Sequence, residues 1–381
     1  MLGIAELLSQ VRGLRAGAIL NPTSVTPSLK HMADVLHEAG TLAALFGPEH
    51  GVRGDVQYLE EVADARDART GVPEHSLYGK DFASLTPRDE HLRGLDALIF
   101  DVQDVGSRYY TYLATMGLAM QAAARHKLPF FVLDRPNPIG GIAVEGGVVH
   151  PGYESFVGLW PVCARHGLTA GEYAGFINQR IGADLRVVPL LGYRRDMDFH
   201  ETRLPWVPPS PNMPTVDTAL VYPGMCLLEG TNLSEGRGTT RPFELFGAPW
   251  LDAERLARDL TAERLAGVRF RPCAFTPTWD KHRAQRCQGV QIHVTYARGV
   301  DAVRLGVAAI VHARAQDPAR FRWRTERYEF VEDKPAIDLL TGDKEFREQA
   351  EQGKGVEELC ALWRAERAAF LEQRERFLLY A

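Results

Sequence analysis

Cysteine is scarce in this sequence, and no two cysteines are spaced as a CxxC pair. Their spacing excludes zinc-ribbon and thioredoxin-like motifs, which need closely spaced thiols. The cysteines are odd in number and far apart, which favours reduced thiols in a cytosolic protein and leaves a secreted protein with free thiols open. They are Cys163, Cys226, Cys273, Cys287 and Cys360.

Long apolar runs and an excess of positive charge are missing as well. No stretch approaches the roughly 18 apolar residues that a membrane helix needs. The formal net charge is −5 and the basic residues are scattered, which argues against nucleic acid and anionic membranes as partners. Glu6 interrupts the first apolar residues, so the N-terminus predicts a helix start and no signal peptide. We expect a cytoplasmic protein, or a periplasmic or secreted one if a leader was removed.

The first two-thirds of the chain alternates short apolar segments with amphipathic ones. This alternation is typical of an α/β fold whose mostly parallel sheet is covered by helices on both faces. The predicted strands are 16–20, 41–46, 97–101, 130–133 and 187–190. The predicted helices are 28–39, 111–126 and 169–181.

The last third has a different pattern, and 381 residues are comfortable for two domains. A proline-rich loop at 204–215 precedes it, and the later elements alternate less regularly. They are a helix at 252–265, strands at 269–275 and 290–296, a helix at 303–312, and a charged amphipathic helix at 345–376. We therefore predict a catalytic α/β domain over 1–245 and a smaller α+β domain over 246–381.

The most informative polar cluster, at 47–55, directly follows a predicted strand. Ligand sites in open α/β sheets form just outside the carboxyl ends of strands. The cluster reads Gly-Pro-Glu-His-Gly-Val-Arg-Gly-Asp, and its glycines allow tight turns. It places Glu49, His50, Arg53 and Asp55 within nine residues, a density of ionisable groups that is costly unless it is used.

Two further clusters follow strands at 101–110 and 134–141. In the first, Asp104 is a candidate acid, and Arg108 beside Tyr109 suits a carboxylate and a sugar face. The second is rich in proline and glycine, which is typical of a turn, and Asn137 is its best candidate contact.

A fourth cluster, at 229–241, is a Gly/Thr/Ser-rich stretch with acids and arginines. Its glycine spacing resembles a phosphate loop, but Arg237 stands where the lysine belongs, so a nucleotide site is rejected. The segment predicts a binding loop whose candidate residues are Asn232, Glu235, Arg237 and Arg241.

Several other chemistries lack their motifs. There is no GxGxxG after the first strand, no GxSxG and no HExxH. A metal held by Glu49, His50, Asp55, Asp101 and Asp104 remains an alternative without a ligand spacing to support it. We predict no cofactor and no metal, and the sequence makes no prediction of oligomeric state.

The clusters together, in this order, resemble the exo-β-N-acetylmuramidase family, which is NamZ-like and forms glycoside hydrolase family 171. The resemblance runs from about Asn21 to the C-terminus. The segments that carry it are 47–55, Ser-Leu-Tyr-Gly at 76–79, 101–112, Asp-Arg-Pro-Asn-Pro at 134–138, Pro-Ser-Pro-Asn-Met-Pro at 209–214, and 229–243.

This resemblance implies a Rossmann-like N-terminal domain, a smaller C-terminal domain and an active-site cleft at their interface. It also implies release of terminal N-acetylmuramic acid (MurNAc) from the non-reducing end of peptidoglycan-derived glycans or muropeptides. Glu49, the glutamate of the Pro-Glu-His-Gly motif, is the implied catalytic acid. A metal-dependent hydrolase and a non-catalytic binding protein for wall sugars are the alternatives.

The remaining roles are our own inference. Desolvation would raise the pKa of Glu49, His50 would orient it, and the partner acid would be Asp104 or Glu235. MurNAc carries a lactyl carboxylate, which an arginine would bind. The candidate arginines are Arg53, Arg108, Arg237 and Arg241, and the other expected substrate contacts are Asp55, Tyr109, Asn137 and Asn232.

Overall fold

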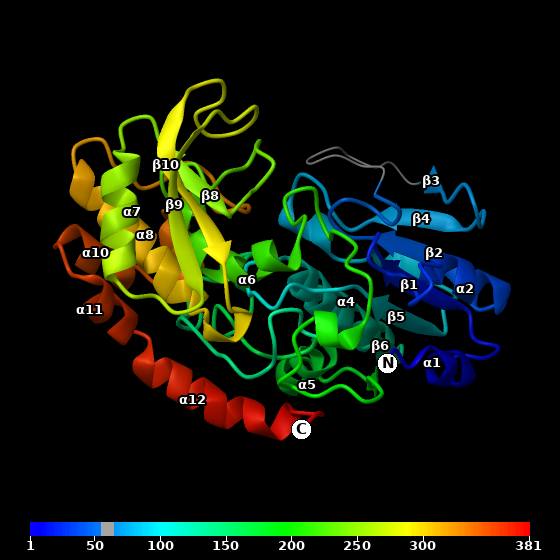
Figure 1. Cartoon of the computed structure of the whole chain (residues 1–381). Coiled ribbons are helices and arrows are strands. Elements are labelled where there is room, and N and C mark those ends of the chain that lie inside the picture. Colours follow the sequence, from blue (N-terminus) through cyan, green and yellow to red (C-terminus); the bar gives the residue numbers. More distant parts are fainter. Residues whose placement is uncertain (55–64) are drawn as a thin grey trace.

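The computed structural model describes residues 1–54 and 65–381, and a seven-stranded sheet dominates the first half of the chain (Figure 1). The strand order is β3–β4–β2–β1–β5–β6–β7, and every neighbouring pair is parallel except β3 with β4. Parallel strands that add outward on both sides of β1 form a doubly wound, Rossmann-like sheet, which confirms the predicted fold class. The strands are β1 (Ala16–Leu20), β2 (Leu42–Gly47), β3 (Ala65–Arg66), β4 (Pro73–Ser76), β5 (Ala97–Asp101), β6 (Phe130–Leu133) and β7 (Leu185–Val188).

Helices cover both faces of this sheet, which is why its central strands are apolar throughout. Every residue of β1, β5 and β6 is buried. On one face, α4 (Tyr112–His126) and α5 (Ala170–Ile181) share a core with Ile19, Phe46 and Phe100. On the other face, α1 (Ile4–Gln10) and α2 (Met32–Glu38) pack on Ala18, Leu45 and Ile99.

The predicted elements of this half are mostly confirmed, and the exceptions have local causes. Helix α2 begins at Met32, later than expected, because the His31 ring accepts the Ala33 N–H and caps the helix there. The strands β3 and β4 were not predicted, because the β4 sequence Pro-Glu-His-Ser is polar and none of its residues is fully buried.

A second, antiparallel sheet in the order β8–β10–β9 organises the C-terminal half (Figure 1). Its strands are β8 (Leu245–Ala248), β9 (Val268–Phe275) and β10 (Cys287–Val294), and its helices include α6 (Val216–Met225), α7 (Ala253–Ala262) and α8 (Ala302–Gln316). Helix α7 packs on β9 and β10, and α6 packs on α8. The predicted domain division at 245/246 stays a prediction.

Helix α6 was not predicted because it contains Pro223 and is apolar almost all round. It crosses α8 at Gly224 and Gly306, where the two backbones touch. A Cβ atom on Gly224 would lie 1.6 Å from the carbonyl oxygen of Ala302, so the crossing requires glycine. A short 3₁₀ segment, Cys226–Gly230, follows α6 and carries Glu229.

The chain ends in separate helices where one long helix was predicted. They are α9 (Ala336–Thr341), α10 (Glu345–Glu351), α11 (Val356–Ala361) and α12 (Arg364–Arg374). The break between α10 and α11 falls at Gly353, whose φ of +83° ends a right-handed helix. Among the described residues, no helix is long and apolar enough to cross a membrane.

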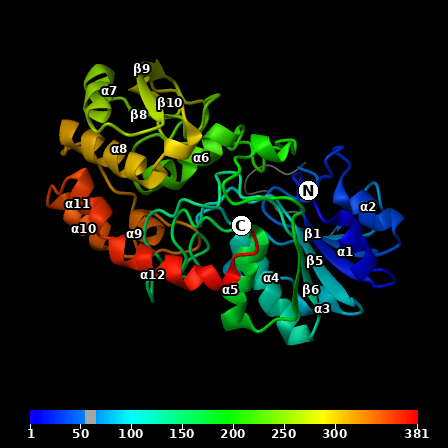
Figure 2. The ribbon, with the colours of Figure 1, turned by 60° about the horizontal axis from the view of Figure 1, so that its bottom comes forward.

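The last helix returns to the N-terminal half. Figure 2 shows α12 running from beside α11 to beside α5. Its Phe370 packs edge-on against Phe176 of α5, with ring centroids 5.4 Å apart. Its Arg374 guanidinium donates to the backbone carbonyls of His166 and Gly167. We call Arg364–Arg374 the α12 strap, because it joins the two halves.

Candidate active site

A cavity of about 740 Å³ lies between the two halves, and both halves line it. From the N-terminal half come the loop after β2, the 78–80 turn and the segment 109–112 that opens α4. From the C-terminal half come residues of the 229–237 loop, Trp279 and Asp280, and the segment 324–330. Its size suits a small sugar ligand.

The loop after β2 places two side chains in this cavity, Glu49 and His50. The Gly51 N–H donates to the Pro48 carbonyl at 2.9 Å, and the turn requires a left-handed φ of +73° at His50. Such a conformation is uncommon for a non-glycine residue and frequent at functional sites. Thr111 Oγ1, at the start of α4, donates to Glu49 Oε2 at 3.2 Å.

His50 is electrostatically suited to stay neutral beside Glu49. Burial lowers its pKa, and this effect outweighs the opposing influence of the Glu49 charge, while Arg237 adds to the lowering. Its Nδ1 atom is buried and has no hydrogen-bond partner among the described residues. A neutral imidazole here can orient a neighbouring carboxyl group or a substrate hydroxyl.

Across the cavity, Glu229 and Glu235 are held by cations. Arg237 lies between them, with Nη2 at 2.7 Å from Glu229 Oε1 and Nε at 3.3 Å from Glu235 Oε1. Lys281 Nζ adds a contact of 3.0 Å to Glu235 Oε2, and Tyr328 donates to Glu229. Burial opposes ionisation of Glu229, but Arg237 and Lys281 outweigh it and lower its pKa. These two acids form the clamped pair of the cavity.

A third part of the site is a tight hairpin at Tyr328–Val331, whose end residues exchange two backbone hydrogen bonds of 2.9 Å. Glu329 and Phe330 occupy the turn, with φ of +47° and +71°. Glu329 faces the cavity, where Arg324 and Arg327 also lie.

Five of the residues expected from the sequence meet at this cavity: Glu49, His50, Tyr109, Glu235 and Arg237. They come from three of the four polar clusters and from both halves of the chain. With acids on two walls and a size fit for a sugar, the cavity is suited to acid–base chemistry on a glycoside.

The two family models that match the chain are described as the N-terminal and C-terminal parts of exo-β-N-acetylmuramidase NamZ. They match residues 16–217 and 220–380. The chain belongs to this family. It is similar to the peptidoglycan β-N-acetylmuramidase NamZ of Bacillus subtilis (strain 168), with 46% identity over 386 aligned residues, 99% of this chain and 91% of that protein.

Solved structures of the family agree with the fold. Two DUF1343 family proteins from Bacteroides fragilis NCTC 9343 superpose over 100% of this chain and 98% of theirs. One has a TM-score of 0.91 at 38% identity, and the other 0.79 at 30% identity.

In this NamZ family member, two arginines expected to bind substrate do not line the cavity. Arg53 is held by Asp67 and Asp34, with Nη2 at 3.0 Å and 2.9 Å from their oxygens. Arg108 is buried and donates to the carbonyls of Gly147 and Val162 at 2.7 Å and 2.8 Å. Both guanidinium groups therefore stabilise the fold, and we no longer expect either to bind substrate.

The remaining polar candidates outside the cavity also have internal partners. Asn137 donates to the Leu168 carbonyl, Asn232 donates to the Arg320 carbonyl, and Arg241 pairs with Glu244. These internal partners account for the positions of the three side chains without a ligand. Asp55 lies outside the described residues.

Asp104, one of the two expected partner acids, is buried behind the cavity and not in its wall. Its Oδ2 accepts the Gly106 N–H at 2.6 Å, so the side chain stabilises the turn after β5. Burial raises its pKa to about 7, against hydrogen bonds from Gly106 and Val105. Of the two expected partner acids, only Glu235 lines the cavity.

Several residues of the cavity were not predicted as site residues from the sequence. Ser210 and Asn212 belong to the Pro-Ser-Pro-Asn-Met-Pro segment, and Tyr78 to Ser-Leu-Tyr-Gly, so the family resemblance was their signal. Arg324 and Glu329 lie in a stretch with no motif, and no sequence signal identified them.

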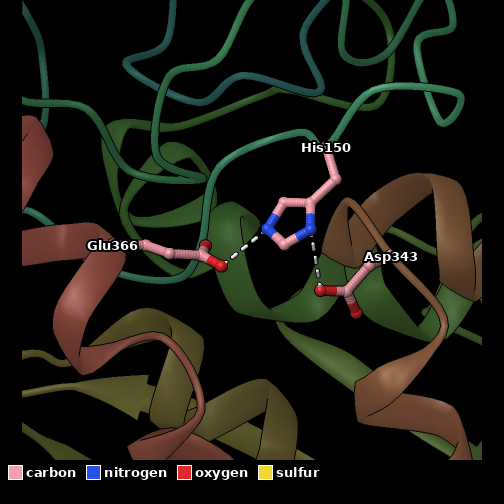
Figure 3. A group of neighbouring side chains, drawn as sticks. All are labelled: His150, Asp343 and Glu366. Carbon is pink, nitrogen blue, oxygen red and sulfur yellow. Dashed lines mark hydrogen bonds and ion pairs between the residues drawn. The ribbon is translucent and has the colours of Figure 1, made fainter.

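Of the residues considered for a metal, Glu49 and His50 line the cavity and Asp101 and Asp104 do not, while Asp55 lies outside the described residues. Among the described residues, the one group with metal-ligand spacing is His150, Asp343 and Glu366, none of which lines the cavity (Figure 3). The His150 ring lies between the acids, with Nε2 at 2.6 Å from Glu366 and Nδ1 at 3.6 Å from Asp343. A single metal ion can bind only one of the two nitrogens of an imidazole ring, and both nitrogens of His150 face carboxylates. The arrangement therefore suits an imidazole that bridges the two carboxylates.

Proposed function

We propose that this chain is an exo-acting glycosidase that releases terminal MurNAc from the non-reducing end of peptidoglycan fragments, with Glu49 as a catalytic carboxyl group. The observation that carries the proposal is the meeting of Glu49 with the cation-clamped Glu235 in one sugar-sized cavity. The 46% identity to a peptidoglycan β-N-acetylmuramidase over nearly the whole chain supports the same activity. Such an enzyme would serve the recycling of cell-wall fragments.

Glycosidic cleavage needs a proton for the leaving oxygen and negative charge near the oxocarbenium-like carbon. Glu49 precedes the neutral imidazole of His50 in the chain and accepts a hydrogen bond from the Thr111 hydroxyl, which orients its carboxyl group. Glu235 is held by Arg237 and Lys281 and serves as the fixed charge that stabilises the carbon centre or orients the substrate's acetamido group.

Selectivity for MurNAc requires a cation for the lactyl carboxylate. Arg237 was one candidate from the sequence, but two glutamates already share its guanidinium. Arg324 lines the same cavity, lies over the Tyr328 ring, and has no carboxylate within salt-bridge distance among the described residues. Arg324 is therefore the better-suited anchor for the substrate carboxylate.

The two alternatives are less well supported. A metal-dependent hydrolase would need Glu49, His50, Asp101 and Asp104 together, yet Asp101 pairs with Arg135 and Asp104 lies outside the cavity. A non-catalytic binding protein would need no acids placed for catalysis. Release of MurNAc in the assay described next would exclude it.

The test is an assay of the purified protein on the 4-nitrophenyl β-glycosides of MurNAc and N-acetylglucosamine, with and without a chelator. We expect release from the MurNAc glycoside, insensitive to the chelator. On a MurNAc disaccharide, whose sugar leaving group needs a proton, Glu49→Gln should lower kcat by about 10²–10⁴-fold, the usual contribution of a positioned acid or base.

Glu38→Gln serves as a matched control, since Glu38 is an exposed acid paired with Lys30 far from the cavity. Binding of MurNAc without release would favour the binding protein. Loss of activity only with the chelator would favour the metal-dependent hydrolase.

A further inference from the structure

We propose that Glu329 is a further catalytic carboxyl group of this site, and that it donates the proton to the leaving sugar. This inference rests on the proposed function and adds a residue that the sequence did not identify. It starts from the position of Glu329 at the tip of a hairpin that enters the cavity from the C-terminal half.

The hairpin tip holds Glu329 in a conformation that its sequence does not favour. Two consecutive positive φ angles are typical of a type I′ turn, which prefers Asn-Gly, whereas Glu329 and Phe330 occupy it here. A left-handed conformation is sterically unfavourable for each such residue. Strain of this kind persists where the surroundings fix the backbone, and it concentrates at functional sites.

Contacts on both sides hold the tip across the cavity. The Phe330 ring packs edge-on against Phe156 and Phe82 of the N-terminal half, at 6.1 Å and 6.3 Å between centroids. The Tyr328 hydroxyl donates to Glu229 at 2.8 Å on the opposite wall. Glu329 therefore has a fixed position within the cavity that Glu49 also lines.

Unlike Glu229 and Glu235, Glu329 has no cation to hold it. Among the described residues, its carboxyl group makes neither an ion pair nor a hydrogen bond. Burial and then the charges of Glu49 and Glu229 raise its pKa to about 8, against the weaker effects of Arg237 and Arg324. The other ionisable groups that line the cavity are His50, Lys80, Glu235, Asp280 and Arg327.

A buried carboxyl group that no cation holds retains its proton near neutral pH, as Glu329 does here. In the reaction, this proton moves to the glycosidic oxygen as the C1–O bond breaks and the bonding electrons stay on that oxygen. The leaving sugar departs as an alcohol. Water then adds to C1, and one of its protons returns to Glu329.

The experiment compares Glu329→Gln with the wild type on two MurNAc substrates. One is a disaccharide with an N-acetylglucosamine leaving group, which needs a proton, and the other is the 4-nitrophenyl glycoside, whose leaving group departs without one. We expect kcat for the disaccharide to fall about 10²-fold or more and kcat for the nitrophenyl glycoside to fall less than about 10-fold. Glu332→Gln is the matched control, because Glu332 is exposed, outside the cavity and near the same hairpin.

A second measurement follows the proton without turnover, through Tm as a function of pH. Glu329 ionises at about 4.5 when unfolded and at about 8 when folded, so the wild type loses stability as pH rises between these values. Glu329→Gln should lack this loss, and Glu49→Gln should reduce it because the neighbouring charge is gone. Asp104 and Asp134 titrate in all three proteins and cancel in the comparison.

The outcomes separate this proposal from the proposed function. An active wild type with Glu329→Gln unchanged, or equally slowed on both substrates, would overturn the role of Glu329 and leave the glycosidase intact. The same holds if the pH dependence of Tm is identical in all three proteins. A wild type that releases MurNAc from neither substrate would overturn the activity and the role of Glu329 together.

Discussion

The two carboxyl pairs that line the cavity differ in what surrounds them. Glu229 and Glu235 lie beside Arg237 and Lys281, and these cations lower the pKa of Glu229 despite its burial. Within the part of the chain that the structure describes, neither Glu49 nor Glu329 forms an ion pair, and Glu49 accepts a hydrogen bond from the Thr111 hydroxyl. The same type of side chain thus carries a fixed charge at Glu229 and, as proposed, a proton at Glu329, and the difference comes from neighbours contributed by distant segments.

The largest effect on stability and activity is expected from removing Arg237, the cation that lies between Glu229 and Glu235. Arg237→Ala leaves Glu229 buried without its main cation, and loss of one partner of a buried ion pair typically costs about 3–5 kcal/mol. We expect the free energy of unfolding in denaturant to fall by that amount and activity to be lost. Arg241→Ala is the control, because its partly exposed pair with Glu244 is worth at most about 1 kcal/mol. Equal effects of the two substitutions would contradict the clamp.

A smaller effect is expected from removing the arginine proposed to bind the carboxylate of the substrate. Arg324→Ala removes the cation proposed for the lactyl carboxylate, at a cost of about 2 kcal/mol, roughly 30-fold in kcat/KM. The loss should appear with the MurNAc glycoside and not with the N-acetylglucosamine glycoside. Arg320→Ala, at an exposed arginine outside the cavity, should change neither. An unaltered preference in Arg324→Ala would remove this residue from the specificity site.

The smallest expected effect concerns the orientation of Glu49. Thr111→Val keeps the side-chain shape but removes the hydroxyl that donates to Glu49. A hydrogen bond of this length contributes about 1 kcal/mol, so kcat should fall about fivefold with KM unchanged. Thr115→Val makes the same substitution one turn further along α4, where the hydroxyl bonds the Thr111 carbonyl, and should leave kcat as it is.

How far the sequence predicts this molecule depends on how local each determinant is. The central strands could be identified because burial on both faces makes each one a continuous apolar run, as in β5 and β6. Glu49 and His50 could be identified because a strand end in an α/β sheet is where ligands bind. These features depend on residues within a few positions of each other.

The parts that could not be predicted depend on distant partners. Arg108 was expected to bind a carboxylate, but its guanidinium reaches carbonyls at Gly147 and Val162 that follow it by many residues. Glu329 lies in a stretch without a motif and reaches the cavity through a hairpin anchored by Phe156 and Glu229. No spacing in the sequence shows which loops will meet.

The α12 strap has a consequence for how the molecule moves and unfolds. It contributes Phe370 to the core of the N-terminal half, and none of its residues lines the cavity. A helix that starts in one half and packs in the core of the other couples their unfolding, so heating should give a single cooperative transition. Moving the two halves apart would also pull this helix away from one of them, so the strap resists a wider opening of the cavity.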